Sequence, residues 1–261
     1  MKLRILVPVA TVVACVALVY AVDVPFTQTR TSGPQTLLIA YRSTPAQRAP
    51  LRQAMVSDGV AQFQRWKDGG VLKDYRILFN SYLDSETYDM LSLLSFADYA
   101  DVAKWREIEK TAPGGLAPSA LPLITSAVTY PLDAARSGGS PERPLPGQSV
   151  FFIIQYDYLT STDEYVRYLD TYVVPQVSGW MAEGVLASYG MYIGRYATGR
   201  PWSSLLVLEY RNHDAFGRRE STVQKVRDRL KQNAAWAAAN DAKQKIRVEK
   251  QTIVAEELMM R

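Results

Sequence analysis

The chain has 261 residues, with 30 Lys and Arg against 26 Asp and Glu, and a formal net charge of +4. Its 48% hydrophobic and 21% charged residues exclude a disordered or collagen-like chain. A single Cys and a single His exclude a disulfide scaffold and a zinc site made from Cys and His alone. No block of like charges marks a nucleic-acid surface, so we predict no nucleic-acid partner.

The first residues have the pattern of a secretory signal peptide. Two basic residues precede an uncharged apolar run, residues 5–22. Ala21 supplies the small residue that signal peptidase needs before its cleavage site. We therefore expect residues 1–21 to be removed and the mature protein to be periplasmic, with no membrane attachment. The alternatives are an N-terminal anchor that is retained and a lipoprotein attached at Cys15.

The rest of the chain contains two copies of one unit. At an offset of 114 residues the two halves align without a gap over residues 37–110, and Trp66 matches Trp180. The shared pattern is Trp-x-x-x-Gly-Val-Leu-x-x-Tyr, which two unrelated segments rarely have in common. We predict repeats over residues 36–136 and 149–261, joined by a Gly-, Ser- and Pro-rich linker over residues 137–148.

In chain order, the first copy predicts a strand, a helix, two strands, a helix and a strand. Runs rich in β-branched and aromatic residues indicate the strands. A helical stretch that stops at two glycines indicates the first helix, and Asp98 indicates the start of the second because Asp caps helix N-termini. The expected strands are 37–41, 75–82, 90–96 and 125–132, and the first helix is 46–67.

The second copy repeats this order. Asn212 takes the capping position of Asp98, and the Ala-rich stretch at 233–239 lengthens the second helix. Pro175 is expected to kink or restart the first helix, because proline lacks a backbone N–H. The expected strands are 150–156, 189–196, 204–210 and 247–258, and the first helix is 162–182.

The element order is that of the ferredoxin-like unit, in which helices cover only one face of the sheet. The nearly continuous apolar strands, such as residues 150–154, need cover on both faces. We therefore predict an α+β fold of two tandem ferredoxin-like (βαββαβ) repeats. They pack sheet to sheet as a pseudo-dimeric α+β barrel within one chain.

The element order, the duplication and the helix–Gly–strand joint resemble the dimeric α+β barrel superfamily, with its EthD-like and antibiotic-monooxygenase-like members. The resemblance covers most of residues 37–258. It implies the fold, and the superfamily includes cofactor-independent monooxygenases, haem-degrading oxygenases and chlorite-dismutase-like haem proteins. Residues 163–184 resemble the first helix of EthD-like proteins, but Val173, and Gly59 in the first copy, stand where that family carries its site His. The fold alone does not choose among these activities.

Polar residues that the second copy has and the first lacks mark a candidate ligand site. At aligned strand positions Gln155 replaces Tyr41, Asp157 replaces Ser43, Arg195 replaces Ser81 and Glu209 replaces Ser95. Such a set at the mouth of an apolar cavity would orient a small amphipathic ligand, and a structural ion pair at the barrel rim is the alternative. The ligand-binding candidates are Gln155, Asp157, Tyr192, Arg195 and Glu209.

The single imidazole, His213, begins the second helix of the second copy, where a solvated surface residue is the simpler interpretation. With one His and no Cys beyond the predicted signal peptide, haem would need His213, Tyr or Met as its axial ligand. We predict no metal and no cofactor.

These observations predict an exported protein that binds a small apolar or aromatic molecule, with no assignable reaction. The alternative is a cofactor-independent oxygenase- or isomerase-type enzyme for a small apolar or aromatic substrate, with Asp157, Tyr192 and Arg195 at its site. A haem protein is a third interpretation. The sequence assigns no catalytic residue.

Overall fold

The computed structural model describes residues 33–259, so the predicted signal peptide, residues 1–21, and Cys15 lie outside the described residues. No helix within 33–259 has the length and apolar composition needed to cross a membrane. The strands are β1 (Gln35–Arg42), β2 (Asp74–Asn80), β3 (Met90–Phe96), β4 (Ser126–Gly139), β5 (Val150–Tyr158), β6 (Leu186–Gly194), β7 (Ser204–Tyr210) and β8 (Arg247–Glu257). The α-helices are α1 (Pro45–Ala54), α2 (Val60–Asp68), α3 (Tyr99–Glu109), α4 (Thr162–Tyr168), α5 (Val174–Ala182), α6 (His213–Gly217), α7 (Arg219–Leu230) and α8 (Ala234–Ile246).

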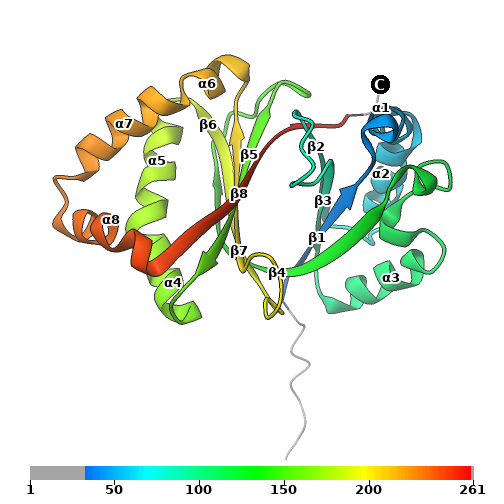
Figure 1. Ribbon diagram of the computed structural model, residues 1–261, viewed down its shortest axis with the longest axis horizontal. Coiled ribbons are helices and arrows are strands. Elements are labelled where there is room, and N and C mark those ends of the chain that lie inside the picture. The colour runs from blue at the N-terminus through cyan, green and yellow to red at the C-terminus, as the bar shows by residue number, and fades with distance from the viewer. Residues whose placement is uncertain (1–32, 260–261) are drawn as a thin grey trace, which may run out of the picture. The chain divides into compact units, whose positions relative to one another are not determined.

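These strands form a closed antiparallel barrel in the order β1-β3-β2-β8-β5-β7-β6-β4. Repeat 1 supplies the sheet β4-β1-β3-β2 and repeat 2 supplies β8-β5-β7-β6, joined through β2 with β8 and through β4 with β6. Helices α1 to α3 flank one sheet and α4 to α8 flank the other, with the strands between them (Figure 1). The predicted α+β barrel of two ferredoxin-like repeats is confirmed.

The central strands of the two sheets, β1, β3, β5 and β7, are buried on both faces along most of their length. Leu38 of β1 and Ile153 of β5 lie in the apolar cluster between the two sheets. Their chain neighbours Ile39 and Ile154 point the other way, into the clusters beneath the helices of repeat 1 and repeat 2. Because side chains alternate across a strand, a nearly continuous apolar run is what this two-sided burial requires.

The first helix of each repeat contains a π-helical turn at the same repeat position. Met55–Gly59 separates α1 from α2, and Leu169–Val173 separates α4 from α5. Pro175 follows this turn and lies in the first turn of α5. Repeat 1 has the same turn with Ala61 at the position that matches Pro175, so the turn does not depend on the proline.

Both first helices end in the same glycine joint. Gly70 and Gly184 have φ angles of 70° and 75°, which favour glycine. The next residue in each repeat, Val71 or Val185, donates its N–H to the carbonyl of Trp66 or Trp180 at 2.9 and 3.2 Å. This pattern is the Schellman helix stop, and it explains why the Gly positions match between the copies.

The second helices begin where the sequence predicts. The Asp98 carboxylate accepts hydrogen bonds from the N–H groups of Ala100 and Asp101. The Asn212 side chain accepts one from the N–H of Ala215. These caps satisfy N–H groups that have no partner within the helix.

The register of β1 corrects the repeat alignment. Leu38 pairs with Leu93, and Ile153 pairs with Val207. Leu93 and Val207 match at the offset of 114 residues, so Leu38 corresponds to Ile153 and the first strands are shifted by one residue against the sequence alignment. A shift of one residue exchanges the two faces of a strand. Gln155 therefore corresponds to Ala40 rather than Tyr41, and Asp157 corresponds to Arg42 rather than Ser43.

The predicted linker begins three residues too early, because Ser137, Gly138 and Gly139 are the last residues of β4 and pair with β6. A Cβ at Gly138 would lie 2.7 Å from the ring of Tyr189. Glycine therefore stands there to let an aromatic ring lie against the backbone, and not to interrupt the strand.

Candidate functional site

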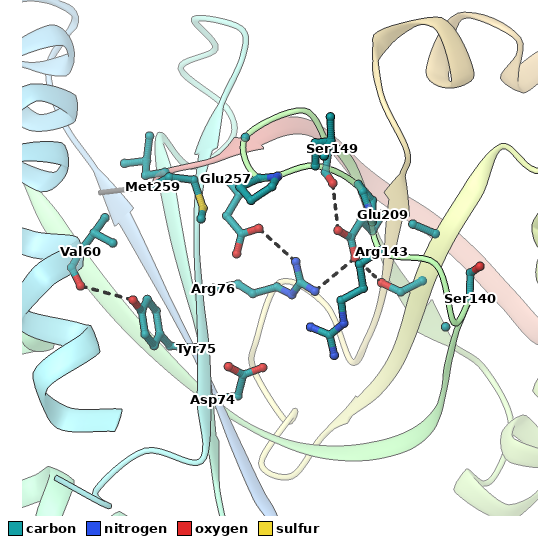
Figure 2. Close-up of a pocket in the computed structure, with 18 of the residues that line it drawn as sticks. Val60, Asp74, Tyr75, Arg76, Ser140, Arg143, Ser149, Glu209, Glu257 and Met259 are labelled. Carbon is teal, nitrogen blue, oxygen red and sulfur yellow. Dashed lines mark hydrogen bonds and ion pairs between the residues drawn. The ribbon is translucent and has the colours of Figure 1, made fainter. Parts of the chain in front are cut away.

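The space between the two sheets is filled by side chains. Aromatic and branched residues from both repeats pack there, including Tyr130, Trp202 and Leu205. A cavity of about 520 Å³ lies instead at the end of the barrel where β2, β5 and β6 begin and β4, β7 and β8 finish. Its walls come from both repeats, from α2 and from the segment that joins the repeats, and they include Val60, Tyr75, Arg143, Leu145, Ser149 and Met259 (Figure 2).

An arginine between two carboxylates forms the polar part of this cavity. Arg76 of β2 makes ion pairs with Glu209 of β7 at 3.2 Å and with Glu257 of β8 at 3.1 Å. Figure 2 shows the three side chains pointing toward one another from different strands. The guanidinium carbon of Arg76 also lies 5.1 Å from the ring centre of Phe151, which belongs to the barrel core. A cation of repeat 1 is thus held by two anions of repeat 2.

Hydroxyl groups complete the surroundings of Glu209. Ser149 donates to one carboxylate oxygen at 2.9 Å, and Ser188 donates to the other at 2.5 Å. Charge-assisted hydrogen bonds of this kind stabilise an ionised carboxylate in a buried position. The position of the Glu209 side chain is therefore fixed by three partners, Arg76, Ser149 and Ser188.

Glu257 differs from Glu209 in its surroundings. Burial raises the pKa of the Glu257 carboxyl above its usual range, the Arg76 guanidinium opposes this rise, and the Glu209 carboxylate adds to it. A carboxyl group with a raised pKa, in a cavity, is a candidate general acid or base. The site therefore combines one carboxylate that accepts several hydrogen bonds with a second carboxyl group whose pKa is raised.

The five residues chosen from the sequence lie in different places. Glu209 lines the barrel-end cavity. Gln155 is buried on the barrel face of β5, and its amide Nε2 has no hydrogen-bond partner. Tyr192 packs against the barrel core with its ring over Gly190, and burial raises the pKa of its phenol.

The remaining two candidates lie toward the opposite end of the barrel, where β5 and β6 finish. Asp157 pairs with Lys250 at 3.2 Å, and Arg195 pairs with Asp133 at 2.6 Å. The five therefore do not converge on one cavity, and their role in ligand binding stays a prediction.

Sequence reasoning missed Arg76 and Glu257. The repeat comparison contained a signal for Arg76, because it aligns with Gly190 and is charged at a barrel-facing strand position. The predicted site rests on residues that the second copy gains, whereas Arg76 is gained by the first copy. Glu257 had no such signal, since the last strands of the two copies lie outside the gap-free alignment.

The described residues do not suit a His-ligated haem. His213 lies exposed in the first turn of α6 and lines neither this cavity nor one that lies between the sheet and helices of repeat 2. Within residues 33–259 no three His, Cys, Asp or Glu side chains are grouped to hold a metal ion.

No protein-family model matches the chain, and no curated protein matches its sequence. Solved structures match its fold. A protein described as a candidate monooxygenase from Fusobacterium nucleatum superposes with a TM-score of 0.54 and 10% identity, over 87% of this chain and 94% of its own. A second protein described as a candidate monooxygenase, from Lactobacillus acidophilus, superposes with a TM-score of 0.52 and 9% identity, over 87% of this chain and 93% of its own. An arginine-to-lysine variant of chlorite dismutase from Candidatus Nitrospira defluvii superposes with a TM-score of 0.51 and 9% identity, over 87% of this chain and 91% of its own. At such low identity these likenesses show the fold alone, and that fold is the dimeric α+β barrel.

Proposed function

We propose that this protein is an exported small-molecule-binding protein whose ligand occupies the barrel-end cavity. The observation that carries the proposal is the Arg76–Glu209–Glu257 cluster beside a cavity of about 520 Å³. Ligand cavities are commonly about 300–1,000 Å³, with apolar walls and a few fixed polar groups. The proposed ligand is a small apolar or aromatic molecule with one polar end. Its apolar body would contact Val60, Leu145, Leu258 and Met259.

Gly139 offers a way to fill this cavity without disturbing the barrel. Its neighbour Gly138 faces Tyr189, so a Cβ at Gly139 points to the opposite face of β4, toward Ser188 and the cavity. That Cβ would lie 3.5 Å from the Cβ of Ser188, an ordinary van der Waals contact. Gly139→Trp therefore places an indole at the cavity with little strain.

The test is calorimetric titration of the protein with 2-naphthol, a neutral aromatic with one hydroxyl group. Saturable binding to the original protein and a loss of at least about tenfold in Gly139→Trp are expected. Gly33→Trp is the matched control, because a Cβ at Gly33 meets nothing within 4 Å. Equal binding by Gly139→Trp and the original protein would contradict the assignment of the ligand to this cavity.

The export part of the proposal rests on the basic start, the apolar run at 5–22 and Ala21. The full chain, expressed in a bacterium with a periplasm, is expected in the periplasmic fraction with Val22 as its first residue. N-terminal sequencing and mass spectrometry check this. An intact N-terminus in the membrane fraction would support the anchor instead, and a lipid on Cys15 would support the lipoprotein.

A second candidate function is an isomerase-type enzyme at the same cavity. The raised pKa of Glu257 and its position in the cavity favour it. The Glu257 carboxylate would take a proton from an acidic C–H bond of a bound ketone, giving an enolate and a neutral carboxyl, and then return it. In D2O, 2-tetralone should then gain deuterium at its α carbon faster with the protein than without it. Glu257→Gln should remove this gain, whereas Glu256→Gln, which faces away and pairs with Arg52, should keep it.

A further inference from the structure

A cavity of about 410 Å³ lies in repeat 2 between the sheet and its helices. Its floor is formed by β5, β7 and β8, and its walls by α5, α7 and α8. Apolar side chains line part of it, including Ile154, Val173 and Leu206. It is separate from the barrel-end cavity, and the two have no lining residue in common.

The charged side chains around this cavity are mostly cationic. The cavity is lined by one carboxylate, that of Glu249, and by four cationic side chains, those of Arg219, Arg227, Lys243 and Arg247. These come from α7, α8 and β8, so three separate elements direct positive charge to one space. Like charges that converge on a cavity raise its electrostatic potential and favour an anion.

Most of these cations lack a carboxylate partner within residues 33–259. The Nε of Arg227 donates to the neutral amide oxygen of Gln176 at 2.8 Å, and the Nζ of Lys243 lies 3.3 Å from the amide oxygen of Asn240. Arg219 pairs with Glu220, whose side chain is 82% exposed. An exposed pair of this kind contributes little, so the positive charge around the cavity is largely uncompensated.

Arg247 lies against aromatic rings. Its guanidinium carbon is 3.9 Å from the ring centre of Tyr156, 5.3 Å from that of Tyr168 and 5.9 Å from that of Tyr172. Ring faces orient a guanidinium and attract it, but they leave its charge in place. Arg247 thus brings a positive charge to the floor of the cavity in an orientation set by these rings.

Two further donors near the cavity have no acceptor. The indole Nε1 of Trp180 and the Nε of Arg219 are buried, and neither finds a hydrogen-bond partner. Trp180 is 6% exposed and lines the cavity together with Arg219. An unsatisfied buried donor is unfavourable, and a ligand with several acceptor oxygens would relieve this.

We propose that the repeat-2 cavity binds an organic anion, a carboxylate or a phosphate ester. Its oxygens lie among Arg227, Lys243 and Arg247, and its apolar or aromatic body lies against Ile154 and Leu206. The proposal is independent of the ligand proposed for the barrel-end cavity, because it rests on different residues and a different ligand charge.

The test is calorimetric titration of the protein with phenyl phosphate, benzoate and benzyl alcohol at a fixed ionic strength. At least one of the two anions is expected to bind about tenfold or more tightly than the neutral alcohol. The stronger of the two identifies the phosphate or the carboxylate as the preferred group. Equal binding of all three probes, or no binding of either anion at millimolar concentration, would overturn the proposal.

Variants locate the site. Arg227→Gln is expected to weaken binding of the preferred anion about tenfold, and Arg247→Met is a second variant from a different element. The matched control is Arg229→Gln, because Arg229 is on the same helix, is exposed, and pairs with Glu183 away from the cavity. Anion binding that Arg227→Gln and Arg247→Met leave unchanged would overturn the assignment. Gly139→Trp should retain anion binding even if 2-naphthol binding proves absent, so failure of one proposal is distinguishable from failure of the other.

Discussion

The two repeats share one fold but use the layer between sheet and helices differently. In repeat 1 that layer is solid: Phe63, Trp66 and Trp105 pack ring against ring, with centres 5.1–6.0 Å apart. In repeat 2 the corresponding layer contains the cavity lined by cations. Trp105 and Arg219 are at matched sequence positions. A buried aromatic side chain in repeat 1 is thus replaced by a cationic side chain in repeat 2. The two halves thus share one fold, and the layer of repeat 2 combines a buried apolar cluster with a cavity.

Two structurally equivalent tyrosines show the same divergence. Tyr41 of repeat 1 is fully buried, and its hydroxyl donates to the carbonyl of Gly114 at 2.5 Å. Tyr156 of repeat 2 has Arg247 over its ring, and burial raises its pKa to about 12 despite that cation. The loop that closes over Tyr41 has no counterpart over Tyr156, where a longer helical segment and an open space take its place.

The largest effect is expected from opening the solid half. Trp105→Ala should lower the free energy of unfolding by about 3–5 kcal/mol, because a fully buried indole leaves a cavity. Arg219→Ala, at the matched position in the repeat that contains the cavity, should change the free energy of unfolding by about 1 kcal/mol or less. Urea unfolding of both variants measures this. Equal losses would show that the two layers do not differ in how tightly they pack.

Glycine substitutions sharpen the same comparison. Gly115 has a φ of 72°, and a Cβ there would lie 2.6 Å from the Trp105 ring and 2.7 Å from the Phe63 ring. Gly115→Ala should therefore cost about 3 kcal/mol, from backbone strain and overpacking together. Gly184→Ala, with a φ of 75° and nothing within 4 Å, should cost about 1 kcal/mol from strain alone. Thermal unfolding compares the two, and similar losses would mean that contact with the rings adds nothing.

A smaller effect concerns the charge that joins the repeats. Arg76→Met leaves Glu209 and Glu257 without their cation and should cost about 2 kcal/mol, since removal of one partner leaves charges that are largely buried. Arg195→Met breaks a pair with Asp133, which is 53% exposed, and should cost about 0–1 kcal/mol. Guanidinium chloride screens ion pairs, so urea is the denaturant of choice.

The smallest expected effect is a change in pH dependence. The folded-state pKa of Glu257 is raised, so its contribution to stability is full below the unfolded-state pKa and is lost as pH rises through the folded-state pKa. Glu257→Gln does not titrate there, so its stability relative to the original protein should improve as pH rises above the unfolded-state pKa of Glu257. Urea unfolding at several pH values checks the sign, and the opposite slope would mean that Arg76 outweighs burial.

The sequence was sufficient for the fold because each element carried its own local signal. The glycine joints, the caps Asp98 and Asn212, and strands apolar on both faces all point to the same architecture. The register of the first strand was wrong by one residue because an apolar run such as that at Leu37 has no polar face to fix it. The end of β4 was missed because glycine can either interrupt a strand or make room for a neighbouring side chain within one. Only the structure shows that the ring of Tyr189 lies against Gly138.

The cavities were less predictable than the fold. Arg76, Glu209 and Glu257 come from three strands, and their meeting depends on how β2 joins β8 at the barrel seam. The aromatic surroundings of Arg247 depend likewise on the bulge between β5 and β8. A sequence pattern gives residue types and local spacing. It does not give the pairing of β2 with β8 or the bulge between β5 and β8, because both depend on packing across the whole barrel.

The final strand of the chain closes the barrel. β8 pairs with β5 over most of its length and reaches β2 through Ala255, Glu256 and Glu257. A nascent chain cannot form this seam until residues 247–257 have emerged from the ribosome. Until then the inner face of the first sheet, with Leu38 and Leu78, has nothing to cover it on that side. Before β8 is available the barrel stays open and exposes apolar side chains, so a holding chaperone would protect the chain from aggregation at this stage.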